Sequence, residues 1–131
     1  MRKTALPQAD RARKIRFERI VVRALRRLPP DVRDMLDNVE IVIEDEPTAE
    51  QIAGNEDGDE LFGFYEGTPL TARDSGYTMV LPDKITIFRR PIERACDTPT
   101  EMADEIRITV IHELAHYFGI EEDRIAELGW A

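Results

Sequence analysis

The sequence predicts one α+β domain, and three observations lead to this prediction. The chain has 131 residues, which is enough for one hydrophobic core but too few for two domains of ordinary size. Segments with helical periodicity lie near both ends of the chain, at residues 1–28 and 99–118. Between them are short segments rich in β-branched and aromatic residues, separated by turn formers, which is typical of strands. We therefore treat residues 1–131 as a single domain.

The N-terminal segment, residues 1–28, predicts a basic amphipathic helix that belongs to this domain. Residues 1–27 contain ten Lys or Arg and two acidic residues, whereas the rest of the chain has a net charge of −17. Apolar residues recur at helical intervals, so the arginines are interpreted as the solvated face. These apolar residues are Ile15, Ile20, Val21, Ala24, Leu25 and Leu28. Nucleic-acid binding is the alternative, but the acidic remainder disfavours it, because phosphate contacts drive that affinity.

The middle of the chain predicts short helices and strands. Pro29 and Pro30 break the first helix, and Asp31 is placed to cap a short helix that reaches about Leu36. Strands are predicted at residues 39–44, 61–67 and 84–89, and a short helix at residues 47–53. The last of these strands alternates in polarity and ends before Pro91, so we expect one face buried and the other wet, as in an antiparallel or edge strand.

The last third of the chain is the most regular. Thr98, Pro99 and Glu101 fit the N-cap, first and third positions of a helix, which together make a capping box. Apolar residues follow at helical steps and Gly119 supplies a left-handed stop, so we predict a helix over about 99–118. Acidic residues at 121–123 then predict the first turn of a short C-terminal helix.

The long helix carries the residues that point to chemistry. His112 and His116 are the only histidines of the chain and are one helical turn apart, so both imidazoles can reach one metal ion. Glu113 stands beside the first histidine, where its carboxylate can act as a general base toward water. This pattern predicts a catalytic Zn²⁺ site that hydrolyses peptide bonds. Packing or solvation of the histidines without a metal is the plainer alternative.

The sequence around the histidines resembles the small bacterial zincin-like metallopeptidases, minimal relatives of the metzincins and Asp-zincins. The stretch that carries the resemblance is His112-Glu113-Leu114-Ala115-His116-Tyr117-Phe118-Gly119, followed by acidic residues, Arg124-Ile125 and Leu128-Gly129. Residues 62–70 and 81–89 also resemble segments of that family, so the likeness covers roughly residues 30–129. It implies a compact zincin-like core in which a small mixed sheet packs on the long helix.

The resemblance also implies a third metal ligand. In the family pattern an acidic residue, commonly aspartate, follows the glycine by three positions, and Glu122 stands there. Its extra methylene group changes its reach, so Asp123 and the more distant Glu127 remain alternatives. The plainer role of the acidic residues at 121–123 is to stabilise the start of a helix. We expect zinc on both histidines and Glu122.

Substrate contacts are less marked in the sequence. An extended peptide can add to an edge strand, and residues 85–89 are the candidate. Tyr65 and Tyr77 carry hydroxyl groups that can stabilise an oxyanion, but packing is the commoner role of a strand tyrosine, and we assign neither a catalytic role. Three arginines can hold a substrate carboxylate, although solvation is the simpler expectation. These are Arg73, Arg89 and Arg90.

The composition excludes several other classes of protein. No apolar run approaches the roughly 18 residues of a membrane span and no secretory signal is visible, so we expect a cytoplasmic protein. Cys96 is the only cysteine, which excludes an internal disulfide and a cysteine zinc cluster. We expect a peptide or protein substrate, no nucleic acid and no membrane. The rival interpretation is a non-catalytic module, stabilised by its metal, that binds a protein partner.

Overall fold

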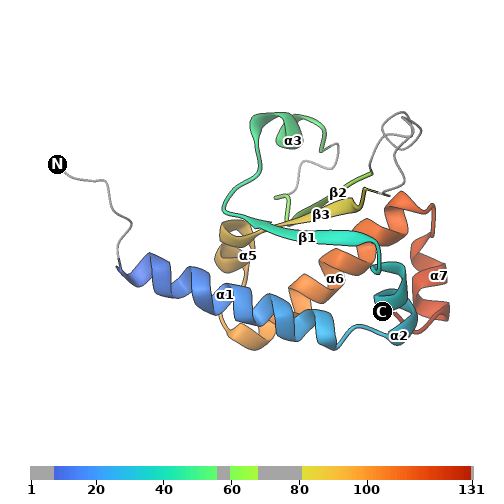
Figure 1. Ribbon diagram of the computed structural model, residues 1–131, viewed down its shortest axis with the longest axis horizontal. Helices are drawn as coiled ribbons and strands as arrows, with labels where there is room; N and C mark the ends of the chain where they lie inside the picture. Colours follow the sequence, from blue (N-terminus) through green and yellow to red (C-terminus); the bar gives the residue numbers. More distant parts are fainter. Residues whose placement is uncertain (1–7, 56–59, 68–80, 131) are drawn as a thin grey trace.

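The computed structural model describes residues 8–55, 60–67 and 81–130 (Figure 1). The helices are α1 (Gln8–Arg26), α2 (Pro30–Met35), α3 (Ala49–Ala53), α5 (Arg89–Ala95), α6 (Pro99–Tyr117) and α7 (Glu122–Glu127), and the strands are β1 (Val39–Glu44), β2 (Gly63–Glu66) and β3 (Asp83–Phe88). Figure 1 shows α1 and α6 on one side of the sheet and α3 beyond its other side. The predicted α+β fold is confirmed. Within the described ranges, no helix is long and apolar enough to cross a membrane.

The described strands form a mixed sheet in the order β1-β3-β2. β1 pairs in parallel with β3, and β2 pairs antiparallel with β3. β3 is therefore the central strand, and the prediction that residues 85–89 form an edge is wrong. Ile85, Thr86, Ile87 and Phe88 are all buried, so neither face of the strand is wet. The apparent alternation was misleading because Thr86 is polar but also β-branched, and such a residue fits a buried strand.

The end of β3 also differs from the prediction. The strand stops at Phe88 and continues directly into α5, a helix that the sequence analysis missed. Pro91 does not end a strand but occupies the third position of this helix. A backbone N–H in the first helical turn has no partner within the helix, so the missing N–H of proline costs nothing there. β2 is likewise shorter than predicted, at Gly63–Glu66.

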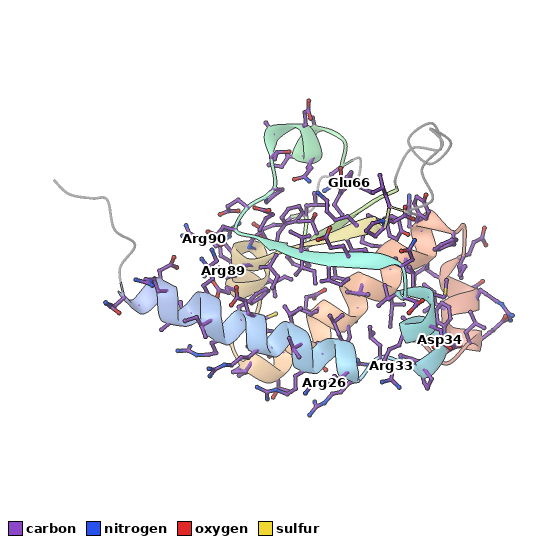
Figure 2. The ribbon with its side chains drawn as sticks, viewed as in Figure 1. Arg26, Arg33, Asp34, Glu66, Arg89 and Arg90 are labelled. Atoms are coloured by element: carbon purple, nitrogen blue, oxygen red, sulfur yellow. The ribbon has the colours of Figure 1, made fainter. Side chains whose placement is uncertain are left out.

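Arg89 is completely buried at the junction of β1, α1 and α5 (Figure 2). Its guanidinium donates to Asp45 at 2.9 Å, to Glu93 at 3.0 Å and to Asp10 at 3.3 Å. The guanidinium holds the pKa of the Asp45 carboxyl below its ordinary value through this hydrogen bond. Arg90 donates to Asp10 at 3.3 Å. The expectation that Arg89 is solvated or holds a substrate carboxylate is therefore wrong, because its donors are spent inside the fold.

The N-terminal helix α1 packs its apolar face against the core, as predicted. Phe17, Ile20 and Ala24 are buried on that face. Ile15, which was assigned to the same face, is 50% exposed. Two residues correspond to about 200° of helical rotation, so Ile15 lies almost opposite Phe17.

The two predicted helix starts have different outcomes. Asp31 does not cap α2, because Pro29 occupies the N-cap position. The Asp31 carboxylate instead accepts a hydrogen bond from the indole N–H of Trp130 at 3.0 Å, which ties the C-terminal residues to α2. The capping box of α6 is confirmed, with the Thr98 hydroxyl accepting from Glu101 N–H at 3.1 Å.

Candidate active site

Helix α6 places His112 and His116 on one side and its core residues on the other. Val110 and Leu114 are fully buried, and this fixes the rotation of the helix about its axis. Both histidines are exposed. Because residues four apart in a helix project from the same side, the two imidazoles face the same region of solvent.

The chain reverses direction directly after α6. Gly119 has φ of +72°, a left-handed conformation that glycine adopts without steric cost. The N–H of Gly119 donates to the carbonyl of His116 at 3.2 Å, and the N–H of Ile120 donates to the carbonyl of Ala115 at 2.7 Å. These two bonds define a Schellman motif, which ends the helix. The predicted stop at Gly119 is confirmed, and the turn brings the start of α7 back toward the histidines.

Glu122, the first residue of α7, lies beside His112. Its Oε1 is 2.9 Å from His112 Nδ1. The two side chains are 73% and 45% exposed, so this contact by itself contributes little to stability. The contact has a more specific effect on the chemistry of the His112 ring. A carboxylate that accepts from Nδ1–H fixes the ring orientation and leaves Nε2 as the lone-pair nitrogen available to a metal.

Glu113 points away from Glu122 toward the sheet. Its Oε1 accepts a hydrogen bond from the backbone N–H of Tyr65 in β2 at 3.0 Å. Partial burial raises the pKa of the Glu113 carboxyl above its ordinary value, while the Tyr65 hydrogen bond and the two histidines act in the opposite direction. A carboxyl with a raised pKa is a stronger base than a solvated glutamate.

Two glycines let β2 lie against α6. A Cβ on Gly63 would stand 2.5 Å from the Thr109 methyl group and 3.2 Å from the Thr86 carbonyl oxygen. A Cβ on Gly67 would collide with the Tyr117 hydroxyl. At Gly63 the opposing groups are the buried Thr109 and backbone, so a larger residue would push the strand away from the helix, whereas at Gly67 the exposed Tyr117 side chain would have to move. The hydrogen bond to Glu113 therefore depends mainly on glycine at position 63.

Aromatic rings close this side of the site. Tyr65 stacks on Tyr117 with ring centroids 4.0 Å apart, and Phe118 meets both rings edge-on. The Tyr65 hydroxyl donates to Asp83 at 2.7 Å. Its oxygen is therefore tied to β3, as expected of a packing residue.

The histidines and the acidic residues share one open hollow of about 740 Å³, which we call the histidine hollow. It is lined by His112, Glu113, Ala115, His116, Gly119, Ile120, Glu121, Glu122, Asp123 and Ile125. A second hollow, of about 670 Å³, lies at the far end of α6, but it contains neither histidine. Of these two hollows, the histidine hollow is the one lined by both histidines and Glu113.

Comparison with known proteins identifies a family. Residues 36–130 match the family described as zincin-like metallopeptidase, which is most of the chain and includes the whole histidine hollow. The chain belongs to the zincin-like metallopeptidase family. No curated protein matches it.

Membership of the zincin-like metallopeptidases implies a zinc ion, and the residues of the histidine hollow fit one chemically. Imidazole nitrogen and carboxylate oxygen are donors that zinc accepts, and the hollow offers both. Among the residues that the structure describes, no three His, Cys, Asp or Glu side chains are gathered into a metal-binding group. Coordination therefore requires the exposed carboxylates of the hollow to turn toward the histidines.

The remaining predicted residues of this zincin-like metallopeptidase have different positions. Asp123 lines the histidine hollow, whereas Glu127 pairs with Arg124 at 3.2 Å and does not line it. Tyr77 and Arg73 lie outside the described residues. The sequence analysis missed the contact between β2 and Glu113. The sequence signal for this contact was the pair of glycines, at 63 and 67, on either side of Tyr65.

Proposed function

We propose that this zincin-like metallopeptidase is a zinc-dependent peptidase in which His112 and His116 hold the ion and Glu113 is the general base. The observation that carries the proposal is the position of Glu113, which adjoins the histidine hollow on one side and an edge strand on the other. When bound, zinc would act as a Lewis acid toward a peptide carbonyl and make a water molecule more acidic.

The chain's own residues would perform the proton transfers. Glu113 would take a proton from the attacking water and deliver it to the leaving amine, which requires the carboxylate form at the start of the reaction. Its hydrogen bond to Tyr65 N–H holds one oxygen toward the strand, so the other is available to water.

The substrate would lie along β2. β2 is an edge strand, and the Tyr65 N–H points away from β3 toward Glu113. An extended peptide that follows this edge would set its backbone beside the base and the histidines. β2 thus replaces residues 85–89 as the candidate substrate-binding edge, because β3 has a neighbour on both sides.

We propose Glu122 as the third zinc ligand, with Asp123 as the alternative. The contact of Glu122 with His112 Nδ1 supports two roles, as a ligand after a rotation of its side chain or as the carboxylate that orients the ring. Zinc titration of Glu122→Gln and Asp123→Asn separates them. Loss of a direct ligand is expected to abolish stoichiometric zinc, whereas loss of an orienting carboxylate should weaken affinity by about 10–100-fold.

The decisive experiment is Glu113→Gln. We expect the variant to fold, to retain one zinc per chain by elemental analysis, and to lose hydrolysis of a peptide library by roughly 10²–10⁴-fold. Glu121→Gln is the matched control, because it removes a carboxylate of the same hollow that has no assigned role. Unchanged hydrolysis in Glu113→Gln would refute the base. Wild-type protein that binds zinc but cleaves no peptide would favour the rival, a metal-stabilised binding module.

A further inference from the structure

The outer edge of β1 is open, at the opposite side of the sheet from Glu113. Asp83 N–H donates to the Asn38 carbonyl at 3.2 Å, in a parallel ladder that sets Val39 opposite Asp83. Alternate residues of a strand bond to the same neighbour, so the backbone groups of Ile41 and Ile43 face away from β3. No strand lies beyond β1 in the described part of the chain. These outward groups are therefore available to another chain.

An apolar groove of about 370 Å³ runs beside this edge. It is lined by Val22, Leu25, Arg26, Arg33, Leu36, Val39 and Ile41, which come from α1, α2 and β1 and their flanks. Figure 2 shows Arg26 and Arg33 at the junction of α1 and α2. Among the described residues, neither arginine has an ion-pair partner. The groove thus combines an apolar surface with two positive charges.

The other face of β1 has the opposite charge. Side chains alternate along a strand, so Glu40 and Glu44 lie on the face opposite to Ile41 and Ile43. Both glutamates are exposed. A segment beside β1 would therefore meet positive charge on its groove side and negative charge on its other side.

We propose that β1 and its groove bind an extended segment of a protein partner by strand addition. The segment would place apolar side chains and an acidic side chain over the groove, near Arg26 and Arg33, and basic side chains next to Glu40 and Glu44. Hydrogen bonds to Ile41 and Ile43 supply affinity, and the two charge patterns decide which face of the segment turns to the groove.

A second copy of the chain fits this edge less well. Each copy has a net charge of −9, so two copies repel one another. In addition, the solvent-side charges of β1 are both glutamates, and a copy of β1 brings no basic residue to meet them. The occupant is therefore a segment of a different protein, in which apolar or acidic residues alternate with basic residues.

The test uses the full-length protein and a fluorescent ten-residue peptide with valines and one aspartate at alternate positions and lysines between them. Two matched peptides carry N-methyl groups on one alternate set of amides or on the other. Fluorescence anisotropy should show that one methylated peptide binds about tenfold or more weakly and the other like the parent, because one set of amides faces β1. No binding of the parent, or equal effects of both methylations, would overturn strand addition.

Variants of the protein test the location. Arg26→Glu with Arg33→Glu should weaken binding, and changing the peptide aspartate to lysine should restore it, while Arg23→Glu leaves binding unchanged. Ile43→Pro should remove binding without unfolding the protein, since this N–H faces away from β3. Circular dichroism confirms the fold of each variant. A dimer in light scattering that Ile43→Pro dissociates would overturn the proposal in favour of a second copy.

Discussion

At the β2 edge the sheet approaches α6 so closely that Gly63 has no room for a Cβ, whereas at the β1 edge the backbone groups of Ile41 and Ile43 face away from β3, beside a groove that Ile41 lines. The first edge gives a backbone N–H to the carboxylate of Glu113. The outward backbone groups of the second edge bond to no residue of the described strands. One sheet of six-residue strands or shorter thus has one edge that bonds to a glutamate of a neighbouring helix and one edge whose outward backbone groups bond to no described strand.

The difference shows how a sheet edge comes to bind one particular side chain. An unpaired edge is a general template for any extended chain. It becomes specific when a helix comes near enough to present a side chain to it, and this requires small residues where strand and helix meet. At the β1 edge α1 and α2 stand across a groove, and the end of the strand is fixed because Asp45 directly follows it and bonds to the buried Arg89.

The largest expected effect concerns the arginine that fixes the end of β1. Arg89→Met removes a completely buried cation, takes this partner from the carboxylates of Asp45 and Glu93, and leaves Asp10 with Arg90 alone. Removing one partner of a buried ion pair lowers the free energy of unfolding by about 3–5 kcal/mol, and unfolding in guanidinium chloride should show a loss of that size. Arg94→Met is the control, because Arg94 also meets two carboxylates but is half exposed, and it should change stability little. Equal losses in both variants would contradict this explanation.

A smaller effect is expected at the β2 edge. Gly63→Ala places a methyl group against Thr109, which is buried and cannot move aside. Overpacking of this kind costs about 1–3 kcal/mol. Thr109→Ser deletes the opposing methyl group and should recover much of the loss, and thermal unfolding of both single variants and the double variant measures the coupling. Strictly additive effects would mean that the strand and helix are not in contact there.

The smallest expected effect is a pH dependence at the end of β1. The hydrogen bond from Arg89 lowers the folded-state pKa of Asp45, so this carboxylate stabilises the fold above its unfolded pKa of about 3.9. That contribution is lost as the pH falls through the lowered folded-state pKa. The stability difference between wild type and Asp45→Asn should therefore be constant near neutral pH and shrink below about pH 4. Urea unfolding at several pH values measures it, and a difference that grows toward acid would reverse the assignment.

How well the sequence predicted each part depended on how local its signals are. The ends of α6 were predicted because Thr98, Glu101 and Gly119 act within one helical turn. The position of β3 in the sheet was not predicted. A central strand that contains a buried threonine has the same alternating pattern as an edge strand, and only its neighbours distinguish the two. Arg89 looked like a surface charge for the same reason, since its carboxylate partners include Asp10, which is 79 residues away. The motif in the histidine hollow was visible in the sequence, but the Tyr65 contact to Glu113 was not.

The Schellman turn at Gly119 has a consequence for assembly of the site. It encloses His112, His116 and Glu122 within eleven consecutive residues, so little loop-closure entropy opposes their meeting. The bond between Glu113 and Tyr65 instead joins residues 48 apart in the chain and forms only when the sheet has docked on α6. Short-range contacts form early and survive partial unfolding, whereas long-range contacts demand the complete topology. If the histidines hold zinc as proposed, a chain loosened at the sheet is therefore expected to keep the zinc ligands together while Glu113 is out of place.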